Sequence, residues 1–167
     1  MLMTSKERVL KREKDNAKIE GRAQGKADAL DLAGRAATMD GTAIIAEENH
    51  IPMFKGTADY TNVPVGAPVA DEGQVWLLLQ PHNAAHHAGR PSTLRALWGL
   101  AHTKDPKKAK AWVDAYGTSG MYMIDECYKD TEGNVYRALQ DNLVYDAATL
   151  PSAWELIEEN NTSEIIS

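Results

Sequence analysis

The chain has 167 residues, enough for one ordinary domain or for two small ones with an extension. Apolar residues make up 43% and charged residues 25%, values typical of a chain that folds around an apolar core. The net charge of −6 argues against general nucleic-acid binding, which needs a basic face. The single cysteine, Cys127, excludes a disulfide framework within the chain and a zinc site built on several cysteines.

The charged N-terminus has no apolar signal core, and no stretch approaches the roughly 18–20 apolar residues of a membrane span. We therefore expect a protein made in the cytoplasm that does not insert into a membrane. Residues 1–22 hold seven Lys or Arg and four Asp or Glu, a net charge of +3, so that the rest of the chain carries −9. This basic segment is interpreted either as an arm that docks onto an acidic neighbour or as the solvated face of a helix.

Residues 5–37 are expected to form one helix, because good helix formers dominate and no proline interrupts them. Small and apolar side chains form a narrow seam of the kind that packs helix against helix, at Ile19, Ala23, Leu30, Ala33 and Ala37. A lone helix of this composition is marginal in water. Residues 1–38 are therefore predicted to be an oligomerisation or attachment arm, with a frayed tail as the alternative.

Residues 39–111 are predicted to hold short elements joined by a linker. Asp40 can cap a helix over residues 42–48, and the prolines and glycines of residues 52–73 indicate an extended linker. The apolar run at 74–80 is typical of a buried strand. Pro91 and Ser92 are expected to open a helix, since its apolar positions follow helical spacing at Leu94, Leu97, Trp98 and Ala101.

Residues 112–157 change to short β segments, predicted at 121–123, 126–128, 135–139 and 154–157, and residues 158–167 form a polar tail. We expect no internal repeat. The fold class is therefore α+β: a long N-terminal helical arm, a linker-rich middle with a strand and a short helix, and a small C-terminal antiparallel β module.

A pattern of aromatic and turn residues crosses this last segment, at Trp112, Tyr122, Asp125, Gly133-Asn134, Tyr136, Asn142, Pro151, Trp154 and Glu155. It resembles the small chitin- and cellulose-binding β module, a carbohydrate-binding module, that is found on glycosidases and attached to phage tail proteins. The sequence departs from that family at Ile124, where the family has Gly, at Cys127, where it has Val, and at Tyr145, where it has a loop Trp. Ala138-Leu139-Gln140 stands where many chitin binders carry paired Trp.

Two earlier segments, residues 39–48 and 91–98, resemble parts of tail or baseplate proteins from phages of Gram-positive hosts. The two resemblances together imply a non-enzymatic virion structural protein for host recognition, made in the bacterial host cytoplasm and assembled into the tail of a phage or phage-like particle. The partners so implied are further copies of the chain in a homotrimer, other tail or baseplate proteins, and host cell-surface polysaccharide. No cofactor and no nucleic acid are expected.

Aromatic planes stack on the apolar face of a sugar, and amides and carboxylates match its hydroxyl rim. The predicted carbohydrate-binding residues are the loop aromatics and two polar neighbours, namely Trp112, Tyr116, Tyr145, Asn142 and Asp141. The polar pair has an alternative role, because Asn and Asp often cap their own loop's backbone. Trp154 and Tyr136 lie in predicted strands and are assigned to the core.

Catalytic alternatives are weaker. His82, His86 and His87 form a cluster, which His102 can extend, but a zinc site needs further ligands and a second shell. Hydrolysis of a glycan needs two carboxylates across one cleft, whereas neighbours on a strand such as Asp125 and Glu126 point to opposite faces. Two other functions therefore stay open: a pure assembly protein whose β module packs on neighbouring subunits, and a metal-dependent hydrolase built on the histidines.

Overall fold

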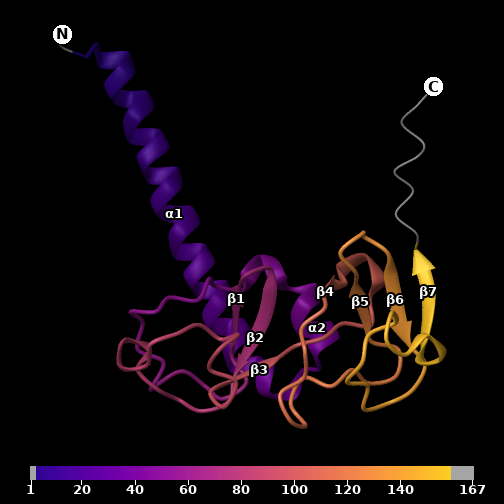
Figure 1. Cartoon of the computed structure of the whole chain (residues 1–167). Helices are drawn as coiled ribbons and strands as arrows, with labels where there is room; N and C mark the ends of the chain where they lie inside the picture. The colour runs from indigo at the N-terminus through magenta and orange to yellow at the C-terminus, as the bar shows by residue number, and fades with distance from the viewer. Residues whose placement is uncertain (1–2, 159–167) are drawn as a thin grey trace, which may run out of the picture.

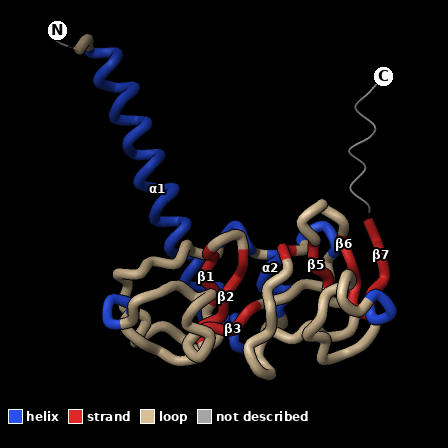
Figure 2. The backbone as a smooth tube through the Cα atoms, viewed as in Figure 1, coloured by secondary structure: helices blue, strands red, loops and turns tan. Residues whose placement is uncertain are grey.

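The computed structural model describes residues 3–158 as a long helix that projects from a body of two small β lobes (Figure 1). Loops and turns make up most of the body, with short strands in each lobe (Figure 2). The predicted α+β class is confirmed. Residues 159–167 of the predicted polar tail lie outside the described residues, while Glu158 ends the last strand.

The projecting helix is α1, Ser5–Arg35, as its composition predicts. A capping box starts it: the Glu7 backbone N–H donates to the Thr4 hydroxyl, and the Glu7 carboxylate accepts from the Thr4 backbone N–H at 2.7 Å. Most of α1 is exposed, and two residues of the predicted seam, Ile19 and Leu30, are 63% and 74% exposed in the single chain. No helix in the described part of the chain is long and apolar enough to cross a membrane.

The base of α1 is anchored in a small core, where Leu32 and Ala36 are buried. A 3₁₀ turn (Ala36–Thr38) follows, and then α2, Gly41–Ala46, whose first turn is capped by Asp40 as predicted. This core combines the helical segments with the first sheet, through Leu32, Ala36, Ile44, Ile45, Ile51, Val75 and Ala101. At the edge of this core, the Arg35 guanidinium donates two hydrogen bonds to the Glu47 carboxylate.

The first lobe contains the sheet β1-β2-β3, formed by β1 (Pro68–Asp71), β2 (Gln74–Leu78) and β3 (Trp98–Leu100), with both pairs antiparallel. The turn between β1 and β2 has two positive φ angles, 52° at Glu72 and 75° at Gly73. A left-handed pair of this kind fits the right-handed twist of a hairpin. The expected strand at 74–80 is confirmed, whereas the expected linker at 52–73 ends in β1.

The helix expected from Pro91 and Ser92 is wrong. Residues 91–97 form turns, and Trp98 and Leu100 belong to β3, which pairs with β2. The helical spacing of the apolar residues arises because a turn places Leu94 and Leu97 against the same core that Trp98 enters from the strand. Sheet pairing and ring burial outweigh the small energy of one isolated helical turn.

The second lobe contains the sheet β4-β5-β6-β7, formed by β4 (Lys110–Ala111), β5 (Cys127–Lys129), β6 (Val135–Ala138) and β7 (Trp154–Glu158). The pairs β5–β6 and β6–β7 are antiparallel as expected, but β4 adds a parallel edge beside β5. Its core is an aromatic cluster in which Tyr122, Tyr128 and Trp154 are buried.

The two lobes repeat one architecture, so the expectation of no internal repeat is wrong. Residues 72–80 and 132–140 agree at five of nine positions, and Thr93-Leu94 and Trp98 recur at the same spacing as Thr149-Leu150 and Trp154. We name residues 53–100 the first repeat and residues 111–157 the second repeat. In Figure 1 they are the lobes that carry β1–β3 and β4–β7.

Backbone pairing confirms the equivalence of the repeats. The register aligns Leu78 with Trp98 in one and Ala138 with Trp154 in the other. Before the first hairpin strand, Gly66 and Asp125 both have positive φ, 92° and 72°. Their N–H groups donate to the carbonyls of Leu78 and Ala138, at 2.7 and 2.9 Å.

Each repeat has aromatic rings at three equivalent core positions. They are Phe54, Tyr60 and Trp98 in the first repeat and Trp112, Tyr122 and Trp154 in the second. The first two rings are stacked, with interplanar angles of 7° and 12°. The Trp lies edge-on to the first ring at 5.8 Å in the first repeat and 6.0 Å in the second. Trp112 is therefore the counterpart of Phe54.

Candidate functional site

A cleft of about 540 Å³ opens on the second repeat. Half-buried Trp112 and Tyr136 and buried Tyr128 provide its aromatic surface. Its lining is completed by the end of β4, the β5–β6 turn and the loop before β7, at Ala111, Lys129, Asp130, Thr131, Glu132, Asp146, Ala147 and Ala148. The cleft thus joins aromatic planes to a rim that holds three carboxylates and one ammonium.

The aromatic surface is held rigid from behind. Trp112 stacks on Tyr122 at 4.9 Å, and Tyr122 stacks on His102 at 3.6 Å, so three rings form one column. The indole N–H of Trp112 donates to the Asp114 carboxylate at 2.8 Å, which fixes the plane of the ring. His102 in turn contacts Glu126 through Nδ1 at 3.0 Å. A ring held in this way can meet a ligand without losing much side-chain entropy.

Tyr136 is held by Tyr128, whose ring stacks on it at 5.5 Å. The Tyr128 hydroxyl accepts the Ala147 backbone N–H at 2.8 Å, which ties β5 to the loop that lines the cleft. Burial raises the pKa of Tyr128 to about 12, although this hydrogen bond acts in the opposite direction. The phenol therefore stays neutral across the physiological range.

The rim is acidic. Asp130 accepts hydrogen bonds from the Glu132 and Asn134 backbone N–H groups and from the Asn134 amide. Partial burial alone would raise the pKa of Asp130, but these hydrogen bonds outweigh it and lower the pKa. Asp146 accepts the Thr149 N–H at 2.9 Å. Within residues 3–158, neither Asp130 nor Asp146 forms an ion pair.

Of the five predicted carbohydrate-binding residues, Trp112 lines this cleft and the other four do not. Tyr116 is 61% exposed in a turn closed by Ser119, and Tyr145 is 57% exposed. Asp141 accepts the Ile124 backbone N–H at 2.8 Å, and Asn142 holds a left-handed φ of 61°. Asp141 therefore has the loop-capping role given as the alternative.

Sequence reasoning missed Tyr136, Asp130 and Asp146. Tyr136 was assigned to the core because it lies on a strand, but its strand position opposite Tyr128 leaves it half-buried in the cleft. Asp130 lies in the turn between β5 and β6, where an Asp is ordinary and indicates no ligand. An alignment of the two repeats would have identified all three residues, because each has a counterpart in the first repeat.

The histidine cluster does not form a metal site in the described part of the chain, where no group of three or more His, Cys, Asp or Glu is placed to hold an ion. His82 is 7% exposed, contacts the Gln80 carbonyl through Nδ1 at 2.7 Å and packs edge-on to His87 at 5.3 Å. His86 is exposed in a 3₁₀ turn, Ala84–His86. These histidines shape a loop and the edge of the first repeat's core.

The carboxylates considered for hydrolysis are engaged elsewhere. Glu126, one of the strand neighbours considered above, contacts His102. The Glu47-Glu48 pair is also engaged, since Glu47 pairs with Arg35 and Glu48 with Lys108 and Lys110. The Cys127 thiol is buried, and burial raises its pKa, which makes it a poor nucleophile. The cleft's chemistry is therefore that of ring stacking and charged hydrogen bonding.

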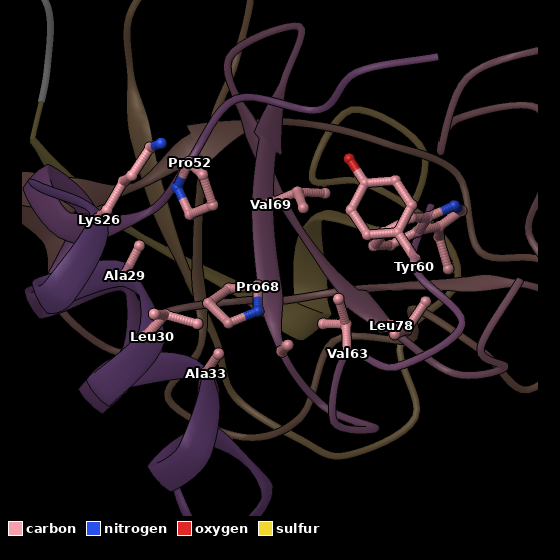
Figure 3. A pocket seen from close by; sticks show the side chains of 12 residues that line it. Lys26, Ala29, Leu30, Ala33, Pro52, Tyr60, Val63, Pro68, Val69 and Leu78 are labelled. Atoms are coloured by element: carbon pink, nitrogen blue, oxygen red, sulfur yellow. The ribbon is translucent and has the colours of Figure 1, made fainter. Parts of the chain in front are cut away.

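Another hollow, of about 320 Å³, lies between α1 and β1. Figure 3 shows Lys26, Ala29, Leu30 and Ala33 of the helix facing Pro52 and Pro68 of the first repeat. The walls are mostly apolar, and the exposed Leu30 stands at the edge. The hollow continues the apolar seam of α1 and offers few polar groups to orient a small ligand.

Comparison of the chain with protein-family models finds no matching family, and comparison with curated proteins finds no matching relative.

Proposed function

We propose that this chain is a non-enzymatic structural protein of a phage tail, baseplate or phage-like particle that binds a host-surface glycan in the cleft of the second repeat. The single observation that carries the glycan part is the pairing of two half-buried rings, Trp112 and Tyr136, with a hydrogen-bonding rim. The particle part rests on the resemblance of residues 39–48 and 91–98 to tail segments.

A sugar ring fits such a cleft because it has an apolar face and a polar edge. Trp112 offers a flat surface whose orientation the Tyr122 stack and the Asp114 hydrogen bond fix. Asp146 and Lys129 can accept from and donate to hydroxyl groups. One shallow contact of this kind is weak, so useful affinity requires several copies on one particle.

The helix α1 suits the attachment role. Its N-terminal part projects away from the body (Figure 1), and Val9, Leu10 and Ile19 are each more than half exposed. An uncovered helix of this composition is marginal in water, so a partner is needed to stabilise it. We propose that α1 joins copies of the chain as a homotrimer and fastens them to other tail or baseplate proteins.

Replacing Trp112 by alanine is expected to weaken glycan binding about 30-fold, the effect of losing a contact worth about 2 kcal/mol. Glycan arrays and host cell-wall pull-down identify the ligand, and titration calorimetry measures its Kd. Tyr145→Ala and Tyr116→Ala are matched controls, since both remove an exposed ring outside the cleft. They are expected to bind as the unchanged chain does.

Because Trp112 also packs on Tyr122, Tyr136→Leu serves as a second variant that keeps an apolar side chain on β6. Unfolding midpoints show whether each variant is folded. The cleft would be contradicted as the site if the Tyr145 and Tyr116 variants lost affinity for the glycan while the Trp112 and Tyr136 variants kept it.

The alternative is an assembly protein whose second repeat packs against neighbouring subunits and binds no sugar. The apolar hollow beside α1 favours it, because protein partners fill such surfaces. No binding of any glycan by the oligomeric protein would support this alternative over the proposal.

A further inference from the structure

The two repeats differ at the positions of two arginines, Arg90 and Arg95. In the first repeat, the Arg90 guanidinium donates to both carboxylate oxygens of Asp71, at 2.9 and 2.6 Å. Asp71 is 2% exposed, so this arginine neutralises a buried charge. The first repeat therefore supplies its own cation to the carboxylate at the end of β1.

A second arginine, Arg95, covers the ring of Trp76 in the first repeat. The Arg95 guanidinium lies 5.2 Å from the centre of the Trp76 ring, a cation–π contact. It also donates to the carbonyl of Asp114, near the start of the second repeat, at 3.0 Å. Trp76 is left 1% exposed, so the chain itself occupies this face.

The second repeat has the acceptors without the arginines. Asp130 is the counterpart of Asp71 in the sheet register. Each directly follows the residue that pairs with the first valine of the next strand, Lys129 in the second repeat and Ala70 in the first. In the turn before the last strand of each repeat, one backbone carbonyl accepts a hydrogen bond from the N–H four residues further along the chain. This carbonyl belongs to Arg90 in the first repeat and to Asp146 in the second, so the two residues are counterparts. An acid thus stands where the first repeat has the cation.

The covering arginine is also replaced. Pro151 is the counterpart of Arg95, since each follows the leucine of the Thr-Leu pair, and Tyr136 is the counterpart of Trp76. Tyr136 is half-buried and lines the open cleft. Among the described residues that line it, Lys129 is the one cationic side chain, against Asp130, Glu132 and Asp146.

We propose that the cleft of the second repeat takes an amino sugar with a free ammonium group, which supplies the cation that Arg90 and Arg95 supply within the first repeat. This inference rests on the proposed function and names its ligand class. The ammonium is attracted to Asp130 and Asp146 and to the aromatic faces, while the sugar ring stacks on Trp112. N-acetylation removes the charge, and an anionic polymer is repelled by the rim.

The test compares binding of a glucosamine oligomer with binding of its fully N-acetylated counterpart, by titration calorimetry on the full chain at a pH at which the amine is protonated. The deacetylated oligomer is expected to bind about tenfold more tightly, with an affinity that falls as salt increases. Asp146→Asn is expected to remove most of that preference. The substituted amide still accepts the Thr149 N–H, so the loop keeps its hydrogen bond.

Glu155→Gln is the matched control, because it neutralises an exposed carboxylate on β7 that does not line the cleft. Equal affinity for the two oligomers, or a preference that survives Asp146→Asn, overturns the amino-sugar inference and leaves glycan binding standing. Binding of neither oligomer nor any other glycan overturns the proposed function as well. Tight binding of an arginine-rich peptide in place of any sugar would show that the cation comes from a protein and also overturns the inference.

Discussion

Replacing Trp98 by alanine is expected to lower the free energy of unfolding by about 3–5 kcal/mol, the cost of emptying a large aromatic site in a core. Trp98 is 0% exposed and lies edge-on to Phe54 at 5.8 Å, to Tyr60 at 5.1 Å and to His82 at 5.5 Å. Its backbone pairs β3 with β2, so the void left by the ring opens directly against the sheet. The first repeat is too small to close such a void.

Urea unfolding followed by circular dichroism measures this change, with Tyr145→Ala as the control for loss of an exposed ring. That control is expected to stay within about 0.5 kcal/mol of the unchanged chain. Trp98→Phe is expected to fall between the two, since it keeps most of the apolar contact. A change below about 1 kcal/mol for Trp98→Ala would contradict the central place of this ring.

Replacing Arg90 by methionine is expected to lower the free energy of unfolding by about 3 kcal/mol, the lower end of the range for breaking a buried ion pair from one side. The reason is Asp71, whose carboxylate is 2% exposed and loses both hydrogen bonds from Arg90. Arg90 itself is 56% exposed, so its own burial contributes little.

Asp71→Asn in the same chain is expected to recover more than half of that loss, because the buried charge is then removed. Denaturant unfolding of both single variants and the double variant forms a cycle that isolates the pair. Strictly additive effects of the two substitutions would contradict a direct coupling between Arg90 and Asp71.

Much of the fold is predictable from local signals. The length of α1 follows from its helix formers and from the Thr4–Glu7 capping box, and Asp40 caps α2 as its position predicts. The buried strand at 74–78 follows from a continuous apolar run ended by Pro81. In these segments, local preference and tertiary packing favour the same structure.

The errors arise where tertiary pairing overrides a local pattern. Leu94, Leu97 and Trp98 have helical spacing, yet the pairing of Trp98 with Leu78 places them in a turn and a strand. β4 has two residues, Lys110 and Ala111, and its parallel pairing depends on β5, which lies sixteen residues further along the chain. No local signal specifies such an edge.

The repeat was hidden by substitution and by uneven spacing. Phe54 replaces Trp112 as the first core ring, and the loop between the hairpin and the last strand is longer in the first repeat, where it holds the histidines. The hairpins at residues 72–80 and 132–140 align without a gap, as do residues 93–98 and 149–154, but the spacing between these two stretches differs. Trp112 could be chosen from its loop position, whereas Asp146 required the comparison with Arg90.

Glycan binding in the second repeat can be followed through the indole N–H signals of the four tryptophans, in ¹H–¹⁵N spectra recorded while a binding oligosaccharide is added. Single Trp→Phe variants assign each signal. The Trp112 signal is expected to shift and to saturate as ligand is added, since that ring lines the cleft, while the signals of buried Trp76 and Trp98 stay in place. Saturable shifts of Trp76 or Trp98 with an unmoved Trp112 would contradict glycan binding in the second repeat.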